Sequence, residues 1–131
     1  MSSSPPRTPH GAPRVIICDY NALLQSVTGL LRMSGFCVFE AYNGEAANEL
    51  CRFLPEIDLL VLNTEGTGTD TPRLIQKVRE AQPRLPVLHI GKEPLPDVPA
   101  DVSHIPETFR PAQLLALVDT LLENRVKSPV V

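Results

Sequence analysis

The sequence predicts one α/β domain in which a parallel sheet lies between two layers of helices. Short, nearly continuous apolar runs alternate along the chain with segments whose apolar residues recur at helical spacing. These runs lack the alternation of a half-exposed strand, which favours a parallel sheet covered on both faces. The chain has 131 residues, 43% of them hydrophobic, which is enough for one domain with an apolar core.

Five apolar runs are long enough for strands but too short for helices. Their alternation with amphipathic segments predicts right-handed βαβ units and a mostly parallel sheet. The third run is the most apolar and ends at Asn63. The predicted strands cover residues 15–18, 36–41, 59–62, 87–90 and 102–105.

Four amphipathic segments predict helices, and the first of them covers residues 21–33. Each helix has a local start or stop signal of a known kind. The signals are Gly35 after the first helix, Asn43 and Pro55 around the second, Thr71 as cap and Pro72 in the first turn of the third, and Pro111 at the start of the last.

The interval between the last two strands is too short for a full helix. Gly91 and Glu107 are separated by 16 positions (107 − 91), whereas a helix of about 11 residues, a strand of about 5 and two loops need more. Three prolines, Pro94, Pro96 and Pro99, also lie there, and a proline inside a helix costs about 3 kcal/mol. We therefore expect the fourth helix to be missing or reduced, with a proline-rich loop in its place.

Five strands that alternate with helices along the chain suit the flavodoxin-like strand order 2-1-3-4-5. In that order the first and third strands are neighbours, and the carboxyl ends of such strands border a cleft. Asp19 follows the first strand and Asn63 ends the third. We therefore expect both side chains in this cleft.

The two ends of the chain are predicted to lie outside the folded domain. Residues 1–13 are rich in serine and proline and have no apolar core, so we expect a disordered N-terminal tail rather than a signal peptide. The domain is expected at 14–124, with a frayed tail at 125–131.

The net charge of −3 gives no attraction to nucleic acid or to a membrane surface, and no stretch is apolar enough to span a bilayer.

Three cysteines, Cys18, Cys37 and Cys51, lie in apolar contexts and contain no CxxC pair. This pattern favours inert core thiols in a reducing cytoplasm over a redox or metal role.

Six short stretches form a pattern that is typical of one protein family. They are Val15-Ile16-Ile17-Cys18-Asp19, Ser34-Gly35-Phe36, Ala41-Tyr42-Asn43-Gly44-Glu45-Ala46, residues 58–62, residues 86–88 and residues 109–114. Together they resemble the receiver domain of bacterial two-component response regulators, over about residues 13–124. The resemblance implies a flavodoxin-like fold and a role in phosphorelay signal transduction.

The resemblance also implies which residues carry the chemistry. In receiver domains two acids and an acceptor aspartate hold Mg²⁺, while a hydroxyl and a lysine bind the phosphoryl oxygens. This chain departs from that set at most positions. Cys18 replaces the first acid, Asp19 keeps the second, Asn63 replaces the acceptor, Gly66-Thr67 replaces the following Met-Pro, Gly91 replaces the hydroxyl, His104 replaces the switch aromatic and Glu107 replaces the lysine.

These departures argue against phosphotransfer. An amide is a poor nucleophile and gives a cation no charge, and Glu107 places a negative charge where the phosphoryl group needs a positive one. At about 4 Å and an effective dielectric near 20, such a contact is worth roughly 4 kcal/mol, and its sign is reversed here. We therefore expect no catalytic residue, no enzyme activity and no cofactor. Asp19 is the remaining, weak candidate for Mg²⁺.

Three functional hypotheses follow. The first is a pseudo-receiver that binds a protein partner or a second copy of itself through the 91–101 loop and the last helix, covering apolar surface that the missing helix leaves on the fourth or fifth strand. The second is a divergent receiver that is still phosphorylated, and the third is a sensor of a small ligand in the cleft. Structural roles are the simpler interpretation of four residues: Asn63 as a polar strand end, Asp19 as a helix cap, and His89 and His104 as partly buried residues.

Overall fold

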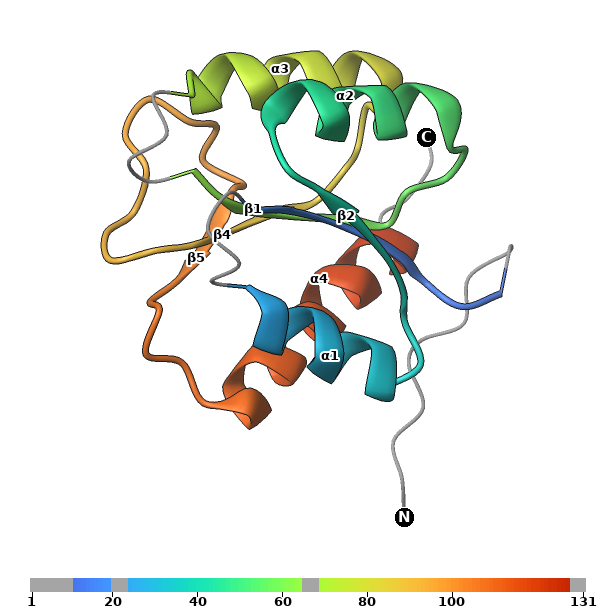
Figure 1. The fold of residues 1–131 in the computed structure, drawn as a ribbon, viewed down its shortest axis with the longest axis vertical. Coiled ribbons are helices and arrows are strands. Elements are labelled where there is room, and N and C mark those ends of the chain that lie inside the picture. The colour runs from blue at the N-terminus through green and yellow to red at the C-terminus, as the bar shows by residue number, and fades with distance from the viewer. Residues whose placement is uncertain (1–10, 20–23, 65–68, 128–131) are drawn as a thin grey trace.

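One parallel sheet forms the centre of the domain. The computed structural model describes residues 11–19, 24–64 and 69–127. The strand order is β2-β1-β3-β4-β5, with all pairs parallel, as the sequence predicts. Helices α2 and α3 cover one face of the sheet, and α1 and α4 cover the other (Figure 1). The elements are β1 (Arg14–Asp19), α1 (Gln25–Met33), β2 (Cys37–Ala41), α2 (Gly44–Phe53), β3 (Leu59–Asn63), α3 (Thr71–Ala81), β4 (Val87–Ile90), β5 (Ser103–Ile105) and α4 (Pro111–Lys127).

The sheet separates two apolar cores, because successive strand residues point to opposite faces. Val15 and Ile17 pack in the core beneath α1 and α4, whereas Ile16 and Cys18 pack in the core beneath α2 and α3. All of β3 is buried. Two-sided burial explains why these strands read as continuous apolar runs.

Most local signals act as predicted. The Asn43 side chain accepts a hydrogen bond from the Ala46 N–H at 2.8 Å and caps α2, and this helix ends before Pro55. Gly35 has a φ of 94°, the left-handed conformation expected after α1.

The predicted cap of α3 was wrong. Asp70 is the capping residue, and its carboxylate accepts a hydrogen bond from the Arg73 N–H at 3.2 Å. Thr71 is the first helical residue, and its hydroxyl bonds to Thr64 instead. Aspartate is the stronger cap of the two, and the proline after Thr71 fits the second helical position because this position still lies in the first turn.

The fourth helix of the predicted rhythm is missing, as expected. Residues 91–101, all of which the structure describes, form turns and bends without a helix. This 91–101 loop joins β4 to β5 (Figure 1). The last helix is consequently labelled α4, and it continues to Lys127, beyond the predicted boundary at residue 124.

The N-terminal boundary of the domain also differs from the prediction. Pro13 is buried, and its carbonyl accepts a hydrogen bond from the Cys37 N–H at 2.9 Å. Residue 13 therefore belongs to the folded domain, because it pairs with the edge strand. The rest of the predicted tail, residues 1–10, and residues 128–131 lie outside the described part of the chain.

The predicted apolar surface on β4 and β5 is not present. All four residues of β4 are buried, and Ile105 of β5 is 8% exposed. Val98 and Val102, from the loop and its junction with β5, pack against the core beneath α2 and α3. The loop thus supplies apolar cover that the missing helix does not. The exposed large apolar side chains in the described chain, Met33, Tyr42 and Phe53, lie elsewhere.

Candidate functional site

The carboxyl edge of the sheet gathers the positions that the sequence singles out. Asp19 ends β1 and lies directly opposite Asn63, the last residue of β3. Gly91 follows β4, and Glu107 follows β5 after Pro106. The segments that flank this edge, 20–23 and 65–68, lie outside the described residues, including the predicted Gly66-Thr67 substitution. A ligand-binding cleft at this edge therefore stays a prediction.

Asn63 is 2% exposed, so the position that carries the acceptor in receivers is buried here. The next residue, Thr64, is also buried, and its hydroxyl lies 2.6 Å from the Thr71 hydroxyl. This hydrogen bond joins the end of β3 to the start of α3. Sequence reasoning missed this contact, although the two threonines flank the same loop.

Asp19 connects β1 to the start of α1. One of its carboxylate oxygens accepts a hydrogen bond from the Leu24 N–H at 2.8 Å, and Leu24 is the residue that precedes the helix. Asp19 thus binds the residue before the helix, whereas the capping residue itself is Leu24, which makes no side-chain capping bond. Among the described residues, no group of three His, Cys, Asp or Glu side chains could hold a metal ion.

Cys18, at the position of the first acid, is a residue of the apolar core. Its side chain is fully buried and packs in the core beneath α2 and α3. Burial, and to a smaller extent the negative charge of Asp19, raise the pKa of this thiol from 9.0 to about 11. Cys18 is consequently a neutral thiol near pH 7, and a neutral thiol is a poor ligand for Mg²⁺.

The two positions after β4 and β5 also lack the groups for phosphoryl binding. Gly91 is buried, and its N–H donates to the Ile105 carbonyl at 3.2 Å. It has no hydroxyl to donate to a phosphoryl oxygen. Glu107 is half-buried and supplies a carboxylate.

His104 contacts His89 across the β4–β5 pair. The two residues are direct neighbours in the register, and their Nδ1 atoms lie 3.0 Å apart. The rings stack with centroids 5.1 Å apart, and His89 is 1% exposed. In a hydrogen bond between them one Nδ1 donates and the other accepts, and the tautomers of the two rings decide which. The sequence indicated two structural histidines but not their pairing, which depends on the strand register.

No family model matches the sequence, and no curated protein is significantly similar to it. Solved structures are similar over most of the chain. The receiver domain of the hybrid histidine kinase CckA is 28% identical with a TM-score of 0.72, covering 83% of this chain and 98% of that one. A response regulator from Thermotoga maritima is 25% identical with a TM-score of 0.71, covering 86% and 98%.

A CheY-like response regulator receiver domain protein from Methanospirillum hungatei JF-1 is 17% identical, with a TM-score of 0.79 and coverage of 91% and 100%. These similarities show that the chain has the receiver (CheY-like) fold. It is a receiver-like domain, and none of its described helices is long and apolar enough to cross a membrane.

Proposed function

We propose that this chain is a pseudo-receiver, a signalling domain that accepts no phosphoryl group and acts by binding protein. The observation that supports the proposal is the set of side chains at the carboxyl edge. An amide stands at position 63, a buried neutral thiol at position 18, glycine at position 91 and a carboxylate at position 107. A phosphoryl group at this edge would meet negative charge where receivers place a lysine.

The proposed binding surface is the 91–101 loop together with α4. The loop stands where the alternation of strands and helices in receivers has a helix. The shape of this face therefore differs from that of a receiver with a complete set of helices. Pro94, Pro96 and Pro99 are exposed on it. Prolines restrict the backbone before binding, which lowers the entropy lost when a partner docks.

A phosphorylation assay tests the first half of the proposal. The wild-type protein and Asn63→Asp are each incubated with acetyl phosphate and Mg²⁺, or with beryllofluoride and Mg²⁺. We expect no gain in mass and no Mg²⁺-dependent change in the NMR signals of Asp19 in either protein. The substitution restores a carboxylate, but Cys18, Gly91 and Glu107 still fail to hold the metal and the phosphoryl oxygens.

A receiver with the full residue set serves as the positive control in that assay. Phosphorylation of the wild type would establish the divergent-receiver hypothesis instead. Phosphorylation of Asn63→Asp alone would show that the substitutions at positions 91 and 107 matter less than the charge argument requires.

Light scattering tests the second half. We expect the wild type to form a species larger than the 14.4 kDa monomer, alone or with a protein captured from its source cells. A variant whose loop residues 92–97 are replaced by a Gly/Ser linker is expected to lose that species, since it lacks the shaped surface. A monomer in both cases, with no captured partner, would contradict the interaction hypothesis.

A further inference from the structure

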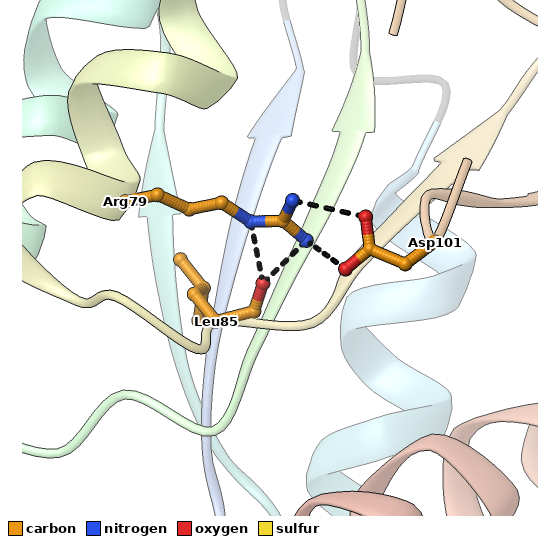
Figure 2. Close-up of polar contacts among 3 residues, drawn as sticks. All are labelled: Arg79, Leu85 and Asp101. Carbon is orange, nitrogen blue, oxygen red and sulfur yellow. Dashed lines mark hydrogen bonds and ion pairs between the residues drawn. The ribbon is translucent and has the colours of Figure 1, made fainter. Parts of the chain in front are cut away.

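Arg79 of α3 joins three segments that are separate in sequence. Its Nε and one Nη atom donate to the Leu85 carbonyl at 3.1 and 2.9 Å. Its two Nη atoms also donate to the two oxygens of Asp101 at 3.0 and 2.9 Å. Figure 2 shows the guanidinium between the carbonyl and the carboxylate. We call this set of contacts the Arg79 latch.

The two contacts of the latch differ in their exposure to solvent. Leu85 is fully buried in the turn before β4, so its carbonyl holds the guanidinium in place. The Arg79 side chain is 18% exposed, whereas the Asp101 side chain is 67% exposed. Asp101 can therefore leave the guanidinium for water, while the contact between Arg79 and Leu85 persists.

Asp101 is the last residue of the 91–101 loop, and Val98 of the same loop packs against the core. Pro94, Pro96 and Pro99 have no N–H to donate. Two backbone hydrogen bonds lie near the ends of the loop, from the Gly91 N–H to the Ile105 carbonyl and from the Val102 N–H to the Pro99 carbonyl. Between these ends, Val98 packs against the core and Asp97 has a left-handed φ of 59°, a conformation that non-glycine residues seldom adopt.

We infer that the Arg79 latch replaces the missing helix as the device that fixes this face of the domain. Closed, it holds the 91–101 loop against α3 and maintains a groove of about 830 Å³ between them. Open, it releases the loop while the sheet stays folded. The groove lies between Arg73 and Lys77 on the helix side and Asp97, Val98 and Pro99 on the loop side.

Two physical facts make the latch both specific and releasable. A planar guanidinium that meets a carboxylate with two parallel hydrogen bonds fixes the orientation of both groups. An ion pair with one partner in solvent is nevertheless a weak contact, and segments held by few buried contacts open locally before the whole domain unfolds. The inference concerns the order of the loop and stands whether or not the loop binds a protein.

Backbone ¹⁵N relaxation on the full chain tests the latch without any partner. In the wild type we expect order parameters at Val98 and Ala100 close to about 0.85, the value of rigid backbone. In Asp101→Asn and Asp101→Ala these should fall, in the alanine variant to below about 0.6, the range of flexible segments. The values at Leu88 and His89 of β4 should stay unchanged, because the sheet does not depend on the latch.

Asp97→Asn is the matched control, since Asp97 is another exposed acid of the same loop. It removes the same charge outside the latch, and asparagine tolerates the left-handed conformation. Arg79→Lys keeps the positive charge but loses the fork, and it should behave like Asp101→Ala. If Arg79→Lys does not fold, the two Asp101 variants decide the question.

Three results would overturn the inference. In the first, the order parameters of the wild-type loop are already below about 0.6. In the second, Asp101→Ala leaves the loop as ordered as in the wild type. In the third, Asp97→Asn loosens the loop as much as Asp101→Ala does, which would make net charge, and not the latch, the cause.

Discussion

Replacing Gln82 with alanine is expected to lower the free energy of unfolding by about 3 kcal/mol. This side chain is buried and follows the last turn of α3. Its amide nitrogen donates to the carbonyls of Cys51 and Leu54 at 2.9 and 2.8 Å. Its amide oxygen accepts from the Ile57 N–H at 3.2 Å. One residue thus satisfies three backbone groups in the connection between α2 and β3.

The cost is large because alanine leaves these groups without that partner in the interior. Each buried polar group that loses its hydrogen bond costs about 1–3 kcal/mol. Two of the groups are carbonyls at the end of α2, where a helix has no internal donor left. For a domain of this size the midpoint of thermal unfolding should fall by roughly 10 °C.

Gln76→Ala is the control for this prediction. Gln76 lies on α3, the helix that Gln82 follows, and is exposed, so its removal should change the unfolding free energy by less than about 0.5 kcal/mol. Urea unfolding followed by circular dichroism measures both variants. Equal stability losses in the two would show that the network around Gln82 is not a significant source of stability.

The overall fold could be predicted because its signals are local. Apolar runs predicted the strands, and capping residues and prolines predicted the helix ends. Pro94, Pro96 and Pro99 indicated that the fourth helix is missing. The strand order was predicted as the flavodoxin-like order that suits five strands in this alternation, and the structure has that order. At Asp70 and Thr71 two capping residue types are adjacent, and the prediction chose Thr71 because Pro72 follows it, although aspartate is the stronger cap.

The contacts that fix the site and the loop could not be predicted in the same way. Arg79 and Asp101 are 22 residues apart, and Gln82 reaches residues 25 to 31 positions away. Such contacts depend on how helices pack on the sheet, which periodicity does not specify. The same holds for His89 and His104, whose contact needs the register of β4 and β5.

Cys18 occupies a position that matches an acidic residue of receivers, but its side chain has a different role. Its place in the sequence identified it with an acidic residue of receivers, but its burial makes it part of the core beneath α2 and α3. A carboxylate there would need the metal and the lysine that usually compensate it. The buried thiol therefore agrees with the proposal that this domain accepts no phosphoryl group.

The domain is expected to lose stability steeply above pH 9, because two buried thiols resist ionisation only while it is folded. Burial raises the pKa of Cys18 and of Cys51 from the ordinary value of 9.0 to about 11. Below pH 9 both states carry the protonated thiol, and the contribution is fully present. Between pH 9 and 11 the unfolded chain releases these protons and the folded chain keeps them, so stability falls as the pH rises.

A shift of about two pKa units corresponds to a loss on the order of 2 kcal/mol for each thiol. Unfolding in urea with a reducing agent, from pH 8 to 11, measures this loss. Cys51→Ala should show about half of the thiol-dependent part of the decline, whatever its stability at pH 8. Cys37→Ala should decline like the wild type, because Cys37 is exposed in the folded protein. If all three proteins decline in parallel, ionisation of lysines and tyrosines governs the alkaline limit, and the buried thiols do not.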